Sequence, residues 1–291
     1  VKEPLRSYPN AQLAAHVIGA VSADEIGIEG IERVFDNKLQ GLSGKVEFEQ
    51  NAAGQPLERV DTSAINGARV VTTIDSVLQH KVEVILSETL AQTHARSVSA
   101  IVLDPRNGEV LALANAPTFD PNERPKALNE ARRNRAITDA YEPGSVFKIV
   151  TYSAAIQEGI VKPENKIFCG NGQIAIGPRI VRDAHPYGEL TVREALAKSS
   201  NVAAIKIGMQ VGKERMFDYL TRFGFGKKTG IDLPYESPGI VRKFENWTQN
   251  SMGSIPMGHE IGVTAVQAVS AMAAIANRGT WVQPHIVKQI V

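Results

Sequence analysis

The sequence contains little cysteine and no excess of charge of either sign. Cys169 is the single cysteine, so the chain cannot form an internal disulfide or a multi-cysteine zinc site. Its 32 basic and 31 acidic residues leave a formal net charge of +1, and this balance gives no electrostatic reason to expect a nucleic-acid partner. The longest apolar stretch, residues 265–276, includes Gln267 and Ser270 and is shorter than a bilayer-spanning helix. We therefore expect neither a disulfide-stapled scaffold, nor a zinc ribbon, nor a membrane span within this sequence.

What is present indicates a globular protein. The 291 residues are 43% apolar and 22% charged, enough for a packed core, and the length favours two domains. The first 70 residues have a mixed character. Apolar residues recur at helical spacing over residues 28–39, with Gly41 after them, and residues 45–60 alternate around a turn at 51–54. These patterns predict one helix and one hairpin in a small first domain.

The pattern changes after residue 70. A β-rich run leads into Asp75, a good N-cap for a long helix that reaches about residue 95. Residues 97–103 and 109–114 predict two strands joined by a turn at 104–108. Thr191 with Glu194, and Thr264 with Gln267, form capping boxes that predict two further helices. Helices are therefore mixed with an early hairpin, which is typical of an α+β domain.

A candidate nucleophile lies where Pro143-Gly144 precedes an apolar helix predicted over residues 145–158. In Ser145-Val-Phe-Lys148 a hydroxyl and an amine are three residues apart, which places both on one helix face. The apolar neighbours would desolvate Lys148 and disfavour its charged form, so that it could accept the serine proton. Alternatively, Ser145 is only an N-cap and Lys148 a solvated residue of the first turn, since one Ser-x-x-Lys is expected by chance.

A second polar break follows at Ser199-Ser200-Asn201, before the apolar residues 202–211. A hydroxyl and a carboxamide at this point could relay a leaving-group proton and hold a substrate amide. A simple polar helix cap is the alternative for this motif taken alone. The occurrence of both motifs once each, in this order, favours the catalytic interpretation.

Together these motifs resemble the penicillin-binding and serine β-lactamase superfamily, and more narrowly the class B penicillin-binding proteins. Three further segments resemble the same family: LDPRNGEVLA at 103–112, NRAITDAYEPGS at 134–145 and LAKSSN at 196–201. The resemblance implies a transpeptidase fold of helices around an antiparallel sheet, over residues 67–291. It also implies a small mixed pedestal module, the family's dimerisation-like domain, over residues 1–66.

The resemblance also implies a function, peptidoglycan D,D-transpeptidation. Ser145 would be the acylated nucleophile, Lys148 its general base, Ser199 the proton relay and Asn201 a ligand of the substrate amide. The substrates would be peptidoglycan stem peptides, and β-lactam antibiotics would acylate the same serine. Partners would be a membrane glycosyltransferase and proteins of the division or elongation machinery. The implied location is the extracytoplasmic, periplasmic face of the bacterial inner membrane, with an N-terminal anchor outside this sequence.

The third motif of the family, Lys-Thr-Gly, is spelled by Lys228-Thr229-Gly230, but we do not assign it that role. It lies soon after the second motif among glycines and is closed by Pro234, which predicts a turn and not the core strand that the family uses. The resemblance places the true motif beyond Val291. We therefore expect a truncated transpeptidase domain, inactive by itself.

The sequence leaves two other functions and one metal site as alternatives. A β-lactamase or carboxypeptidase would use the same serine, but the pedestal-like module and the lack of a recognisable deacylating glutamate motif disfavour it. A β-lactam sensor or a non-catalytic division or elongation scaffold is the alternative from another class. Cys169, Asp183 and His185 lie near a region where some relatives bind zinc, but a fourth ligand is missing from the sequence pattern. We expect no metal and no cofactor.

Overall fold

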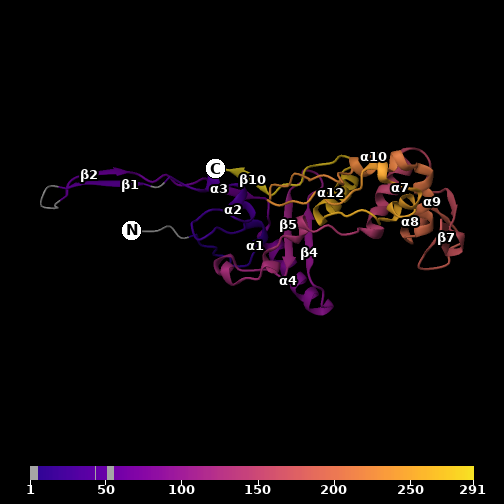
Figure 1. Cartoon of the computed structure of the whole chain (residues 1–291), viewed down its shortest axis with the longest axis horizontal. Coiled ribbons are helices and arrows are strands. Elements are labelled where there is room, and N and C mark those ends of the chain that lie inside the picture. Colours follow the sequence, from indigo (N-terminus) through magenta and orange to yellow (C-terminus); the bar gives the residue numbers. More distant parts are fainter. Residues whose placement is uncertain (1–5, 43, 51–55) are drawn as a thin grey trace.

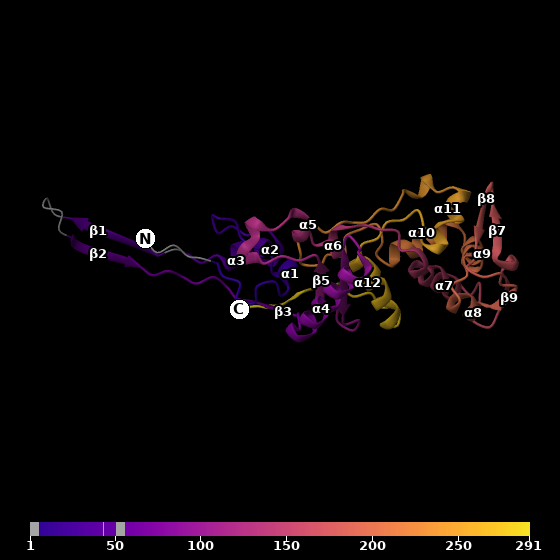
Figure 2. The same ribbon diagram turned by 90° about the horizontal axis from the view of Figure 1, so that it is seen from below.

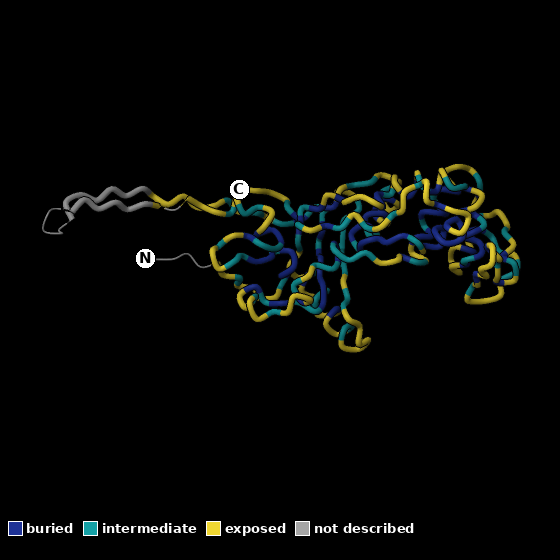
Figure 3. The backbone as a smooth tube through the Cα atoms, viewed as in Figure 1, coloured by how far each residue is buried: buried dark blue, intermediate teal, exposed yellow. Residues whose placement is uncertain are grey.

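The computed structural model describes residues 6–42, 44–50 and 56–291, and within 45–62 the description is limited to the backbone. The molecule is elongated (Figures 1 and 2). The β1–β2 hairpin extends from one end, and helices α7 to α10 lie at the other. Buried residues concentrate in the middle and in this distal helical part (Figure 3). The fold therefore has three parts along its length: an N-terminal module, a central layer and a distal helical core.

The described residues form helices of four to 18 residues, strands of three to seven residues and a few 3₁₀ turns. The α-helices are α1 (Ala15–Ile18), α2 (Gly30–Val34), α3 (Asp36–Leu39), α4 (Ser76–Thr93), α5 (Asn129–Arg132), α6 (Arg135–Thr138), α7 (Lys148–Gln157), α8 (Val192–Ala197), α9 (Asn201–Val211), α10 (Lys213–Arg222), α11 (Gln249–Met252) and α12 (Ala265–Ala276). The strands are β1 (Lys45–Gln50), β2 (Pro56–Thr62), β3 (Val70–Thr72), β4 (Val98–Leu103), β5 (Val110–Ala116), β6 (Lys166–Phe168), β7 (Gln173–Ile176), β8 (Arg179–Arg182), β9 (Glu189–Thr191) and β10 (Val287–Ile290). Every strand pair within the described residues is antiparallel, as predicted for the fold class.

The single helix predicted over residues 28–39 was wrong. The backbone N–H of Ile28 donates to the carbonyl of Ala20 at 2.9 Å, so this residue is held in an extended pairing and the helix begins only at Gly30. Phe35, with φ −111° and ψ 19°, then separates α2 from α3. Helical periodicity did not reveal that a non-local pairing takes the first residues away from the helix.

The hairpin predicted over residues 45–60 is confirmed for its two strands. β1 pairs with β2 in an antiparallel register that joins Lys45 to Thr62. The predicted turn at 51–54 lies outside the described residues. In both ribbon views the hairpin extends away from the rest of the chain.

The central layer is the predicted hairpin of β4 and β5, covered by helices. The carboxylate of Asp75 accepts hydrogen bonds from the backbone N–H groups of Val77 and Leu78, both at 2.9 Å, which starts α4 where the sequence predicted it. Leu86 of α4 packs against the alanines of β5, and α12 contacts β4. The buried Gln79 fixes helix to strand, because its amide exchanges hydrogen bonds with the backbone of Leu113 at 2.8 and 2.9 Å.

The distal core is built from α7, α9 and α10. Tyr152, Ile207 and Leu220, one from each of these helices, are almost completely buried in a single apolar cluster. Two nested hairpins flank it, since β7 pairs with β8 inside the longer pairing of β6 with β9. These hairpins and α10 were not predicted from the sequence. They matter because β8 ends directly beside the start of α9.

A small two-stranded sheet brings residues 70–72 beside residues 287–290. β3, which directly precedes α4, pairs with β10 near residue 291. A hydrogen bond of 2.8 Å from the backbone N–H of Arg69 to the carbonyl of Val291 extends this pairing. Over the described ranges, we find no helix with both the length and the apolar character required to cross a bilayer.

Candidate active site

Ser145 lies in a 3₁₀ turn, Gly144–Phe147, that precedes α7, whereas the sequence predicted that the α-helix would begin at the serine itself. Ser145 is exposed. Gly144 has φ +53° and its N–H donates to the carbonyl of Gly258 at 3.0 Å. The loop around Gly258 thus holds the residue before the serine, and Ser145 itself is open to solvent.

A second contact holds the same approach to Ser145. Glu142 accepts a hydrogen bond from the backbone N–H of Glu260 at 2.9 Å, and its other carboxylate oxygen lies 2.9 Å from Nδ1 of His259. Tyr141 and Val263 exchange backbone hydrogen bonds at 3.0 and 2.9 Å. His259 thus lies in a surface hydrogen bond with Glu142, and the loop at 258–260 is tied to the segment that leads to Ser145.

Lys148 is the first residue of α7 and its side chain points into the protein. The residue is only 1% exposed. Its Nζ donates to the backbone carbonyl of Ser199 at 2.5 Å, to Ser199 Oγ at 2.9 Å and to Asn201 Oδ1 at 2.8 Å. Burial lowers the pKa of Lys148 to about 8, while the charge of Asp183 acts in the opposite direction. A lysine in this environment is a neutral amine in a substantial fraction of molecules near neutral pH.

The second motif lies at the start of α9 and is held in an unusual backbone conformation. Ser199 has φ +54°, in the left-handed region that non-glycine residues rarely adopt. Ser200, which is fully buried, accepts a hydrogen bond from the N–H of Ala203 at 3.0 Å and caps the helix. The positive φ turns the carbonyl and hydroxyl of Ser199 toward α7, where both accept from Lys148.

The structure therefore brings together three of the four predicted site residues, Lys148, Ser199 and Asn201. The fourth, Ser145, lies one turn before Lys148, and among the described residues its hydroxyl makes no hydrogen bond with the lysine. Catalytic hydrogen bonds are often formed only when substrate is bound. The structure places Lys148 of the first motif against Ser199 and Asn201 of the second, and the direct serine–lysine contact is not formed in this structure.

Sequence reasoning missed the role of Asp183, which it considered only as a metal ligand. Its carboxylate accepts from the hydroxyl of Ser200 at 2.7 Å and from the N–H groups of Asn201 and Val202 at 2.5 and 3.0 Å. No local sequence pattern could show this, because Asp183 follows the β7–β8 hairpin and is distant in sequence from the N-terminus of α9 that it binds. Across residues 6–42, 44–50 and 56–291 there is no group of histidine, cysteine and acidic residues that could hold a metal ion.

The segment Lys228-Thr229-Gly230 forms a loop, as predicted, and not a strand. Both the N–H and the hydroxyl of Thr229 donate to Oε1 of Glu236 at 2.6 Å, and the N–H of Gly230 donates to Oε2 at 3.1 Å. Thr229 and Glu236 are each 6% exposed. The loop is closed by this internal carboxylate and contributes nothing to the cluster around Lys148.

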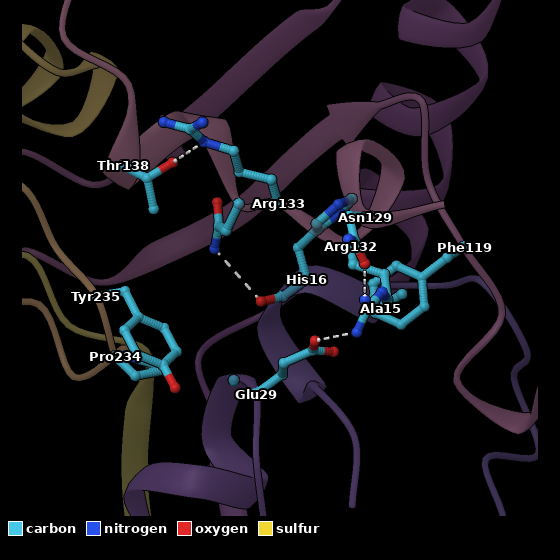
Figure 4. Close-up of a pocket in the computed structure, with 12 residues that line it drawn as sticks. Ala15, His16, Glu29, Phe119, Asn129, Arg132, Arg133, Thr138, Pro234 and Tyr235 are labelled. Carbon is cyan, nitrogen blue, oxygen red and sulfur yellow. Dashed lines mark hydrogen bonds and ion pairs between the residues drawn. The ribbon is translucent and has the colours of Figure 1, made fainter. Parts of the chain in front are cut away.

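A cavity of about 280 Å³ lies elsewhere, at the junction of the N-terminal module with residues 129–138 (Figure 4). Glu29 and Arg132 line it and form an ion pair, with Nη1 and Oε1 3.1 Å apart. The buried His16 also lines it, and its Nε2 lies 2.8 Å from the carbonyl of Ala131. Ser145 and the lysine cluster are not part of this cavity, so it is a feature of the junction between modules.

Comparison with known proteins shows the family of the chain. Residues 98–291 match the family described as "Penicillin binding protein transpeptidase domain", and residues 1–72 match "Penicillin-binding Protein dimerisation domain". The resemblance to class B penicillin-binding proteins, noted in the sequence, is thereby confirmed. The match to the transpeptidase domain includes both motifs.

Individual relatives are similar along nearly all of this chain. Penicillin-binding protein PbpB of Mycobacterium tuberculosis is 36% identical over 296 residues, covering 100% of this chain and 43% of the relative. Peptidoglycan D,D-transpeptidase FtsI of Escherichia coli is 34% identical over 281 residues, covering 96% of this chain and 47% of the relative. The chain thus spans about half the length of these curated relatives.

Solved structures share the fold. The crystal structure of penicillin binding protein 3 from Mycobacterium tuberculosis superposes with a TM-score of 0.87 at 36% identity, covering 99% of this chain and 62% of that chain. The same relative has been crystallised in complex with aztreonam and with ampicillin. The chain therefore belongs to the penicillin-binding proteins, with a transpeptidase domain preceded by a dimerisation domain.

Proposed function

We propose that this protein is a peptidoglycan D,D-transpeptidase that cross-links stem peptides through a serine acyl-enzyme. The observation that carries the proposal is the buried Lys148, whose side chain is held by Ser199 and Asn201 one turn after an exposed serine. As an ammonium, the lysine uses all three of its hydrogens in these contacts. As a neutral amine it has one hydrogen fewer and a free lone pair, which can accept a proton from Ser145.

In the proposed reaction, Ser145 Oγ attacks the penultimate D-Ala carbonyl of a stem peptide while Lys148 takes the hydroxyl proton. The tetrahedral intermediate collapses to an ester of the serine, and the C–N bond to the terminal D-Ala breaks. Ser199, which is hydrogen-bonded to Lys148, returns the proton to the leaving amine. Asn201 holds the substrate amide. The amine of a neighbouring stem then attacks the ester, which forms the cross-link and releases Ser145.

The remaining parts of the proposal follow from the family. Residues 1–66 act as a pedestal and residues 67–291 as part of the transpeptidase domain, a division supported by the pairing of β3 with β10. The partners are stem peptides, β-lactams, a membrane glycosyltransferase and proteins of the division or elongation machinery. The protein acts at the extracytoplasmic, periplasmic face of the inner membrane.

The test is intact-mass measurement after incubation with a fluorescent penicillin. It is made on this chain and on a version extended past Val291, because the family's third motif is expected there. We expect one adduct on the extended protein and none on its Ser145→Ala variant. Ser153→Ala is the matched control, because this serine lies on α7, the helix that follows Ser145, and makes no hydrogen bond with Lys148, Ser199 or Asn201; it should keep full labelling.

Two results would change the proposal. An extended, folded protein that stays unlabelled would contradict an acyl-enzyme and favour a non-catalytic scaffold. A stable adduct on a protein that never cross-links or hydrolyses stem peptides would favour a β-lactam sensor.

A further inference from the structure

Asp183 connects two parts of the fold that are distant in sequence. It follows the last residue of β8, and its own N–H donates to the carbonyl of Gly172 at 2.9 Å, which fixes its backbone. Its carboxylate lies at the N-terminus of α9, where it accepts the three hydrogen bonds described above. Free backbone N–H groups and the helix dipole both favour a negative charge at this position.

These contacts fix how the second motif faces Lys148. Arg182, the neighbour of Asp183, accepts a hydrogen bond from Asn201 Nδ2 at 3.0 Å through its backbone carbonyl. The amide nitrogen of Asn201 is therefore directed to β8, and the amide oxygen is left to accept from Lys148 at 2.8 Å. The end of β8 thus holds both the backbone and the side chain of Asn201.

Asp183 also supplies the negative charge that faces this lysine. Three further titratable groups lie in the neighbourhood of Asp183. Tyr152 of α7 and Cys169, which follows β6, interact with its charge, and Lys206 of α9 interacts with Cys169. Burial raises the pKa of the Tyr152 hydroxyl and of the Cys169 thiol, so both are neutral near pH 7. Lys206 Nζ donates to the carbonyl of Phe168 at 2.6 Å. Asp183 is the acidic group whose charge opposes the effect of burial on Lys148.

We propose that Asp183 is a positioning residue with two effects: its hydrogen bonds hold the Ser199–Asn201 turn against Lys148, and its negative charge beside that turn favours the ammonium form of the lysine. The carboxylate makes no hydrogen bond with Lys148 itself; it binds the backbone of Asn201, whose side chain contacts the lysine. The electrostatic part of this inference rests on the proposed acylation of Ser145, whereas the positioning part stands on the hydrogen bonds alone.

The first experiment measures the pH dependence of penicillin acylation for Asp183→Asn on the extended protein. Asparagine keeps the shape and one acceptor oxygen but removes the charge. We expect the acid limb of the profile to move down by about 0.5–1 pH unit, because a lysine without its opposing anion loses its proton more easily. We also expect the plateau rate to fall by about 10- to 100-fold, because the motif is held less firmly.

The control is Glu189→Gln, which removes one negative charge from β9, where the carboxylate pairs with Lys166 at 2.8 Å and has no contact with α9. It should leave both the midpoint and the plateau unchanged. If Asp183→Asn lowers the plateau with an unmoved midpoint, the residue is merely structural and the electrostatic effect is wrong. If neither quantity changes, the whole inference is wrong.

The second experiment does not depend on catalysis. Hydrogen exchange of the Asn201 and Val202 amides is measured in the wild type and in Asp183→Ala, since both amides donate to Asp183 Oδ1. We expect their exchange to accelerate at least about tenfold while the amides of α7 keep their protection. Unchanged protection would refute the positioning effect. If the wild type is never acylated but these amides do accelerate, the proposed function fails and the positioning effect survives.

Discussion

A substitution at Asn201 tests whether Lys148 is the group whose ionisation controls acylation. Asn201→Asp is nearly isosteric and places a carboxylate where an amide oxygen now lies 2.8 Å from Lys148 Nζ. The new charge stabilises the ammonium form of the lysine, so the pKa of Lys148 must rise. The substitution also removes the donor to the carbonyl of Arg182, which costs some stability.

The size of the effect follows from the short distance. Two unit charges 2.8 Å apart attract by about 6 kcal/mol at an effective dielectric constant of about 20. Solvent and the desolvation of the new carboxylate reduce this ceiling, and opposite charges in close contact typically shift a pKa by about 1–3 units. With a pKa of about 8, about one Lys148 in ten is neutral at pH 7. In the variant this fraction falls to between about one in 100 and one in 10,000.

The assay is the pH dependence of penicillin acylation, measured from pH 6 to about pH 10.5, the upper limit being the ordinary pKa of lysine. The rate at pH 7 should fall by about 10- to 1000-fold, and most of it should return at high pH, where the lysine loses its proton. Asn201→Ala is the matched control, because it loses the same amide without adding charge, and its midpoint should not rise. A loss of rate in Asn201→Asp that is equal at every pH would refute the assignment of Lys148 as the base.

Three further substitutions test the framework around the site. Gln267→Leu should lower the free energy of unfolding, measured in urea, by about 3 kcal/mol or more. The reason is that the N–H of Thr264 and the backbone carbonyls of Lys227 and Pro238 lose their hydrogen-bond partner. A loss below about 1 kcal/mol would contradict this. Gly258→Ala should abolish penicillin labelling and lower the melting temperature, since φ is +87° and a Cβ would lie 2.0 Å from the carbonyl oxygen of Gly144; labelling at the wild-type rate would show that the loop does not hold Ser145. Asp75→Ala should cost about 1 kcal/mol in the same urea assay and leave labelling unchanged, because it removes only the N-cap of α4.

Features with local causes were predictable from the sequence. The N-cap of α4 and the capping boxes of α8 and α12 need only residues within one turn of each other, and all three occur where predicted. The hairpin of β4 and β5 needs a five-residue turn between two β-rich runs. In each case the interaction that fixes the element lies within the segment whose sequence pattern predicted it.

Features with distant causes were not predictable. β6 to β9 are strands of three or four residues, too short to show a clear alternation, and β6 and β9 pair across an intervening hairpin. The helix predicted over 28–39 lost its first residues to Ala20, a partner that no periodicity reveals. Sequence patterns report on neighbours along the chain, whereas these elements depend on neighbours in space.

The candidate site divides in the same way. The spacing of Ser145 and Lys148 pointed to a serine and a lysine on one helix face. The groups that bind the lysine belong instead to Ser199 and Asn201 at the start of α9, and that start is held by Asp183, which follows β8. In the proposed function the first motif supplies the reactive groups, and the β7–β8 hairpin, which has no motif of its own, holds the second motif beside them. Because Lys148 reaches Ser199 and Asn201 only when α9 begins at the right residue, the basicity of the lysine and the capping of α9 are coupled. A substitution that removes the hydrogen bonds at the start of α9 must therefore change two quantities. These are the protection of its first amides from hydrogen exchange and the pH at which Lys148 loses its proton.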